Sequence, residues 1–267
     1  NTPDYVVALA VWHVDDFEFA GRSHDTRWQK IEQEVKQAIK WTEWEMNEYV
    51  QLGVRTRQLR DYSFLLDQKN YVNDIDEIDI APARKKQSQE PATDSEKSQL
   101  MAVLGSIMYK VQKTGPEYAA ETGWLQSKRT TAQVSDLVAA NRMVSRMKSR
   151  CERCLPVHTF PDEEIAMVCW EDAAHANRPD GKSTAGYIVA AAPRRLLHGD
   201  ECSVTLLDWG SHKIQQVCRS AAAAEARSMA DAEDHLSAGR YMMAEALGRW
   251  KEGLTIDQVI ATVPGVI

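Results

Sequence analysis

The sequence contains no apolar run of the roughly 20 residues that a membrane-spanning helix needs, although 43% of its 267 residues are hydrophobic. Its first residues, "NTPDYVVALAVW", also lack the positively charged leader of a signal peptide. A membrane partner is therefore not expected. The protein is expected to be intracellular and cytoplasmic.

Cysteine is scarce as well. The chain has five cysteines, an odd number, which favours a reduced intracellular protein over a disulfide framework. Cys151 and Cys154 form one CxxC pair, but no second close pair follows. Free thiols are the simple interpretation, and a zinc site at this pair stays open as an alternative.

Excess positive charge is also missing, because the formal net charge is −7. This balance argues against a protein that holds nucleic acid by bulk charge, but it leaves room for a local basic groove. Between residues 128 and 153, seven basic residues face two acids, Asp136 and Glu152. This stretch is either a solvated helix face or a surface that follows phosphates. Its basic residues are Lys128, Arg129, Arg142, Arg146, Lys148, Arg150 and Arg153.

Two adjacent carboxylates stand out near the N-terminus, in "AVWHVDDFEFAG". The flanking segments predict two strands joined by a tight turn. However, no glycine follows Asp15 and Asp16, although short hairpin turns favour Asn-Gly or Asp-Gly. Neighbouring carboxylates also repel each other unless a cation lies between them. The pair is therefore either a plain turn or part of a cation site.

The rest of the chain predicts an alternation of helices and strands. An amphipathic helix is expected in "HDTRWQKIEQEVKQAIK", then two strands in "EYVQLGVRTRQL" and "DYSFLLDQ", and a short helix in "KNYVNDI". Polar residues 81–97 predict a loop or linker. Thr93 and Glu96 fit a capping box that starts a helix, and two more helices are expected after Pro116 and around residues 134–147.

After Pro161 the pattern changes to three apolar strands, "IAMVCW", "AGYIVAAA" and "SVTLLDW". A long Ala-rich helix is expected from about Lys213 to Leu247, which predicts a separate α/β unit. Asp172 ends the first strand, and Glu225 lies on the apolar stripe of the helix, where a carboxylate needs compensation for lost solvation. An acid at a strand end commonly marks only the exit into solvent. The functional interpretation is that these two carboxylates meet at the end of the sheet and share a divalent cation, for which oxygen ligands favour Mg²⁺.

The order of these features resembles the Pol polyprotein of copia-type LTR retrotransposons. "HVDDFEFAG" resembles the family's Tyr-Val-Asp-Asp catalytic hairpin, and "LGSIMYKVQKTGPEY" resembles "IGSLMYL…TRPD". "EDAAHANRPDGKSTAGYIV" is similar to the first RNase H hairpin, "SDADWAGDPDDRRSTSGYV". "SAAAAEARSMA" stands where the family has "SSTEAEYMA", with Glu225 matching the second glutamate.

This resemblance implies an α/β (α+β) chain with three regions. Residues 1–80 would be the end of a reverse transcriptase palm with its primer grip, 81–153 a linker and helical thumb or connection, and 154–267 a truncated RNase H-like domain. Asp15 and Asp16 would hold two Mg²⁺ ions around the primer end and the incoming nucleotide. Asp172 and Glu225 would hold Mg²⁺ in the RNase H site. The implied partners are an RNA template, a DNA primer and their RNA–DNA hybrid.

The chain also departs from the family pattern. His13 replaces the tyrosine, Gly115 and Glu117 replace the Arg and Asp of "TRPD", and Ala223 replaces the first glutamate. Further acids of both active sites are expected outside these residues, so the 267-residue chain alone is expected neither to polymerise nor to cleave. The alternative hypothesis is a decayed or repurposed relic that binds nucleic acid or a protein partner without catalysis.

Overall fold

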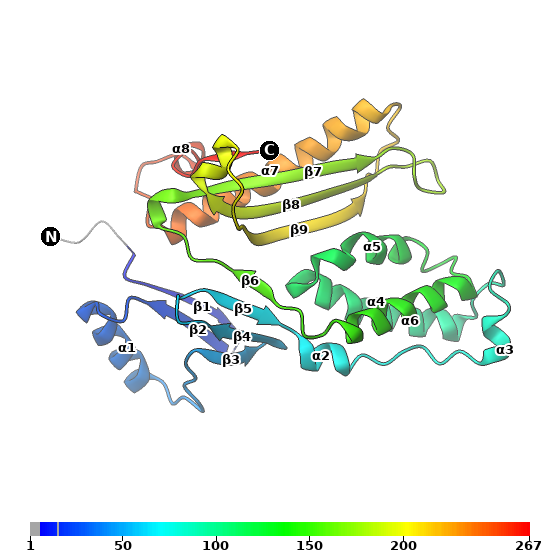
Figure 1. Cartoon of the computed structure of the whole chain (residues 1–267), viewed down its shortest axis with the longest axis horizontal. Coiled ribbons are helices and arrows are strands. Elements are labelled where there is room, and N and C mark those ends of the chain that lie inside the picture. Colours follow the sequence, from blue (N-terminus) through cyan, green and yellow to red (C-terminus); the bar gives the residue numbers. More distant parts are fainter. Residues whose placement is uncertain (1–5, 15) are drawn as a thin grey trace.

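A computed structural model of the chain describes residues 6–14 and 16–267, which form a mixed α/β structure (Figure 1). The strands described are β1 (Ala8–His13), β2 (Asp16–Gly21), β3 (Glu48–Gln51), β4 (Val54–Gln58), β5 (Phe64–Asp67), β6 (Leu155–Val157), β7 (Ile165–Ala174), β8 (Thr184–Pro193), β9 (Thr205–Lys213) and β10 (Gly265–Val266). The α-helices described are α1 (Thr26–Ala38), α2 (Lys69–Asn73), α3 (Pro82–Lys85), α4 (Asp94–Thr114), α5 (Ala119–Ser127), α6 (Val134–Ser149), α7 (Ala221–Ala246) and α8 (Ile256–Ile260).

The N-terminal strands β1 and β2 form the expected hairpin, in register from Ala8 opposite Gly21 to His13 opposite Asp16. Val14 has a φ of 58°, the left-handed conformation that short hairpin turns require. On one face, Phe17 and Phe19 pack against an aromatic pair that follows α1, Trp41 and Trp44. The amphipathic helix is confirmed as α1.

The second sheet has the order β3-β4-β5-β6 and is antiparallel throughout. It contains one strand more than expected over "EYVQLGVRTRQL", because Leu52 and Gly53 both take positive φ and turn the chain between β3 and β4. The strand β6 pairs with β5, Leu66 lying opposite Leu155. The region expected to begin at residue 154 therefore starts with a strand of the second sheet.

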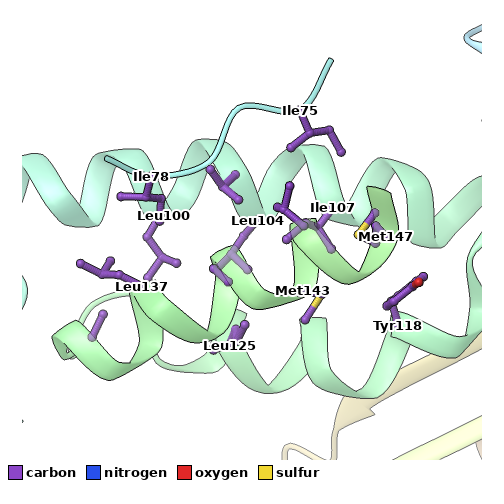
Figure 2. Close-up of a cluster of buried hydrophobic side chains, with 14 of the residues drawn as sticks. Ile75, Ile78, Leu100, Leu104, Ile107, Tyr118, Leu125, Leu137, Met143 and Met147 are labelled. Carbon is purple, nitrogen blue, oxygen red and sulfur yellow. The ribbon is translucent and has the colours of Figure 1, made fainter. Parts of the chain in front are cut away.

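A helical unit made by α2 to α6 lies beside this sheet (Figure 1). The expected capping box is present, since Thr93 accepts a hydrogen bond from Glu96 N and the Glu96 carboxylate accepts one from Thr93 N. The polar segment expected as a linker contains α3, where Arg84 bonds Glu96 at 2.9 Å. Figure 2 shows the core of this unit. Its largest contributors include Ile75, Ile78, Leu100, Leu104, Ile107, Tyr118, Leu125, Leu137, Met143 and Met147.

The third sheet has the order β10-β7-β8-β9. The pairs β7–β8 and β8–β9 are antiparallel, as expected, and β10 lies parallel to β7. The long helix α7 crosses one face of this sheet (Figure 1). It begins at Ala221 rather than near Lys213, because β9 extends to Lys213 and Ser220 caps the helix by accepting from Ala223 N.

The helical unit contacts the third sheet through β9. Trp209 Nε1 donates to the Val111 carbonyl at 2.8 Å, which ties β9 to α4. Gly123 of α5 lies so close to the Ser211 carbonyl that a Cβ atom there would be 2.9 Å from the oxygen. Over the described residues, every helix is too short or too polar to cross a bilayer.

Candidate metal-binding carboxylates on the third sheet

The two faces of β7 have different surroundings. Met167 and Cys169 are buried in one cluster with Ala232 and Leu236 of α7. Val168 is buried on the other face, in a cluster that excludes α7. Side chains of a strand alternate between faces, so odd-numbered residues of β7 point toward α7 and even-numbered residues point away.

This alternation places Glu171 on the α7 face and Asp172 on the opposite face. The β7–β8 ladder is regular from Ile165 opposite Pro193 to Ala174 opposite Thr184, so no bulge reverses the pattern along β7. Ala173 confirms the parity, because it packs against a buried cluster that includes Ala224 of α7. Asp172 is exposed, and Glu171 is half-buried.

Glu225 lies in the second turn of α7 and is half-buried. Three residues later, the buried Ser228 donates its hydroxyl to the Asp172 carbonyl at 3.2 Å. Residues three apart share a helix face. This part of α7 therefore lies level with the end of β7, and Glu225 belongs to the stripe that covers the sheet.

The alternation of β7 argues against the expected pairing of Asp172 with Glu225, which stays a prediction. As an even-numbered residue of β7, Asp172 points away from α7. Its side chain and that of Glu225 therefore lie on opposite faces of the sheet. The carboxylate of β7 that shares the α7 side with Glu225 is Glu171. At the end of β7, Glu171 and not Asp172 is therefore the acid on the face that α7 covers.

Glu171 carries an unusual feature for a carboxylate. Its Oε2 atom is buried and has no hydrogen-bond partner in the described part of the chain. Burying an ionised oxygen without a partner is costly, and such atoms are normally satisfied by a donor or a cation. Carboxylate oxygens suit Mg²⁺, which usually takes one or two of them and keeps several waters. A divalent cation beside Glu171 is therefore one way in which this oxygen could be satisfied.

Cys169 lies two residues from Glu171 on the same face. Burial raises the pKa of its thiol to about 11, and the nearby carboxylates of Glu171, Glu233 and Asp208 act in the same direction. The thiol is therefore neutral at physiological pH. Since the thiolate is the nucleophile and the metal-binding form, Cys169 is a packing residue here.

A second polar group occupies the β9 side of α7. His235 Nδ1 lies 2.8 Å from Asp208 Oδ2, and the Tyr187 ring stacks on the His235 ring at 3.9 Å. Burial, followed by the Asp208 carboxylate, raises the pKa of Tyr187. These contacts fix the β9 side of the helix and leave Glu171 and Glu225 toward the β7 side.

The sequence contains a signal for Glu171. Between Pro-Asp and Ser-Thr, this chain has two residues, Gly181 and Lys182, where the quoted family pattern has three. Counting from Pro-Asp selects Asp172 as the match to the family's first aspartate. Counting back from the Ser-Thr-x-Gly-Tyr landmark selects Glu171. A one-residue difference changes the face of a strand, so the two counts lead to different sites.

The hairpin pair is placed only in part. Asp15 falls outside the described residues. Asp16 is exposed, begins β2 and pairs with His13. It shares a hairpin face with Glu18, whose carboxylate contributes to raising the pKa of Tyr49 after the larger effect of burial. The expected cation site at Asp15 and Asp16 remains a prediction.

Among the described residues, no further zinc ligands are arranged around Cys151 and Cys154. Cys154 Sγ lies 3.3 Å from an Arg57 guanidinium nitrogen and 3.9 Å from Asp67 Oδ2, which are polar contacts to side chains of the second sheet. Within residues 6–14 and 16–267, no group of three or more His, Cys, Asp or Glu side chains is arranged to hold a metal ion.

Comparison of the chain with protein-family models, with curated proteins and with solved structures finds no match.

Proposed function

We propose that this chain is part of a copia-type retrotransposon Pol protein, and that its third sheet with α7 is an RNase H-like unit that engages an RNA–DNA hybrid. The main support is the arrangement at Glu171. Three antiparallel strands precede a helix that covers one face, the next strand lies parallel to β7, and an orphaned carboxylate oxygen lies on the covered face.

In this proposal Glu171 and Glu225 hold a divalent cation between β7 and α7. A Mg²⁺ ion held by these two carboxylates would supply Lewis acidity toward a phosphate oxygen of the hybrid. Glu171 is oriented by its position in a regular, ten-residue strand. Glu225 is held by the helix, which the Ser228 bond fixes against β7. Asp15 and Asp16 are proposed to serve the polymerase hairpin of the parent protein in the same way.

A second candidate is a non-catalytic relic that retains only binding. Ala223 favours it, since this residue replaces the first glutamate of the family pattern and is exposed in the first turn of α7. His13 favours it too, because it stands where the family has the tyrosine of the polymerase hairpin. The relic would bind nucleic acid or a protein partner without catalysis, so the two candidates differ in whether the parent protein turns over a hybrid.

The test is binding of the 267-residue chain to an RNA–DNA hybrid at two salt concentrations, with and without Mg²⁺. We expect binding at low salt that weakens steeply as salt rises, because phosphate contacts release counterions. Mg²⁺ is expected to strengthen binding by the wild type and by Asp172→Asn, but not by Glu171→Gln. Absence of binding at low salt would remove the nucleic-acid role. Mg²⁺-dependent cleavage that Glu171→Gln abolishes would exclude the relic.

A further inference from the structure

A cavity of about 280 Å³ lies where the helical unit meets the start of β6. Its volume is close to the lower end of the range for small-molecule sites, roughly 300–1,000 Å³. The lining comes from the end of α4, the residues that follow it, and the turn between α6 and β6. It includes three cationic residues, Lys110, Arg150 and Arg153, and one acid, Glu117.

Lys110 is a buried cation with a relative exposure of 7%. Its Nζ atom donates to Thr114 Oγ1 at 2.6 Å and approaches the Thr114 carbonyl at 3.5 Å. Burial lowers the pKa of this ammonium, and the Glu117 carboxylate is the largest of the charges that oppose this shift. No carboxylate in the described part of the chain forms an ion pair with it. An ammonium without a counter-ion is costly in such a place.

The chain makes room for this lysine. Gly115 lies directly against the Lys110 side chain, and a Cβ atom there would be 3.2 Å from Lys110 Cγ and 3.3 Å from Lys110 Cε. A larger residue at position 115 would push the lysine stem away. Gly115 therefore leaves space for the stem of this lysine, which is one of the residues that line the cavity.

Two arginines reach the same cavity from one turn. Arg150 is the C-cap residue that follows α6, and the Arg153 backbone N–H donates to the Arg150 carbonyl at 3.0 Å. Other cations in or beside the basic stretch have acidic partners, since Lys128 pairs with Asp136 at 3.0 Å and Lys69 with Glu152 at 2.6 Å. Among the described residues, no such ion pair involves Arg150 or Arg153.

We propose that this cavity binds a phosphate group. Three cations against one carboxylate leave it net positive, and an arginine fork presents two parallel donors to the oxygens of a phosphate. A bound phosphate would also provide the counter-ion that Lys110 lacks. The proposal is independent of the RNase H-like site, which lies on another sheet. It gives the end of the basic stretch a specific role as part of a concave site.

The test is calorimetric titration of the whole chain with inorganic phosphate in a buffer free of other oxyanions. We expect saturable binding at one site. Lys110→Met and Arg153→Gln should each weaken it at least tenfold, and Glu117→Gln should strengthen it by removing the opposing charge. Arg142→Gln is the matched control, because Arg142 is an exposed arginine of α6, the helix that leads to Arg153, and lies outside the cavity lining.

The proposal fails if phosphate does not saturate, or if Arg142→Gln weakens binding as much as Arg153→Gln, since diffuse surface charge would then explain the signal. Arg153 is exposed, so its variant gives an answer even if Lys110→Met does not fold. Competition with a single-stranded oligonucleotide identifies the source of the phosphate. Displacement assigns the cavity to a nucleic-acid strand, and retention assigns it to a free phosphate compound.

Phosphate binding and hybrid binding can fail separately. A chain that binds phosphate and not the hybrid retains the cavity proposal and loses the RNase H-like one. If the chain binds the hybrid but not phosphate, the RNase H-like proposal is retained and the cavity proposal is lost.

Discussion

Glu171 and Asp172 are chemically similar neighbours, yet the sheet gives them opposite environments. Glu171 has the parity of buried Met167 and Cys169, and Asp172 has the parity of Trp170, which is 48% exposed. A carboxylate on the covered face loses water and needs a cation or donors, whereas one on the open face keeps its water. Which of these two adjacent carboxylates could share a cation with Glu225 therefore depends on which face of β7 each one occupies.

Lys110 gives a prediction at the same scale. Because its pKa in the folded protein lies below the ordinary 10.5, the unfolded chain binds more protons between the two values. The burial penalty is therefore fully present below the folded pKa and is relieved as pH rises from that value toward 10.5. The groups whose charges oppose this shift are Glu117, Asp67, Cys154 and Cys151.

We expect Lys110→Met to be at least as stable as the wild type at about pH 7 in a phosphate-free buffer, because it removes a buried charge. The advantage of the variant should shrink as pH rises toward 10.5. Urea unfolding at several pH values measures this difference. A variant that is markedly less stable at neutral pH, or an advantage that grows with pH, would contradict the account of Lys110.

At the scale of elements, local chemistry predicts most helices and the ends of several. Thr93 with Glu96 starts α4, as the capping-box pattern predicts, and Asp25 caps α1 by accepting from Arg27 N. The turn at Leu52 and Gly53 is not predicted, because Leu52 takes a positive φ that its side chain does not favour. The expected start of α7 is too early, since β9 extends to Lys213 and Ser220, a favoured N-cap residue, marks the start of the helix at Ala221.

Two glycines test how helices are positioned by their neighbours. A Cβ added at Gly105 of α4 would have no neighbouring atom within 4 Å, whereas a Cβ at Gly123 of α5 would meet the Ser211 backbone oxygen at 2.9 Å. Gly105→Ala should stabilise the protein by roughly 0.5–1 kcal/mol through helix propensity. Gly123→Ala should destabilise it by about 1–3 kcal/mol through overpacking against β9.

Thermal and urea unfolding of the two alanine variants measure the difference. Both variants replace a glycine inside a helix by alanine. Opposite signs of their changes in the free energy of unfolding would therefore report the contact between α5 and β9. Equal stabilisation by both variants would show that the helical unit does not press against the third sheet at Ser211.

At the scale of the whole molecule, β6 and α5 connect the three regions. The strand β6 returns the chain from the helical unit to the second sheet, and α5 packs on β9 of the third (Figure 1). These contacts join residues far apart in the sequence, as in the pairing of Leu66 with Leu155. Local patterns carry no information on such pairings, so the strand β6 and the cavity beside it could not be predicted from the sequence.

The central claim is that the cation site of the third sheet involves Glu171 and Glu225, and that Asp172 takes no part. Mn²⁺ tests it most directly, because this paramagnetic ion replaces Mg²⁺ and broadens the NMR signals of nearby amides. We expect substoichiometric Mn²⁺ to broaden the amide signals at the end of β7 and in the first turns of α7. The effect should be lost in Glu171→Gln and in Glu225→Gln and should persist in Asp172→Asn. Broadening that survives Glu171→Gln, or that disappears in Asp172→Asn, would contradict the account.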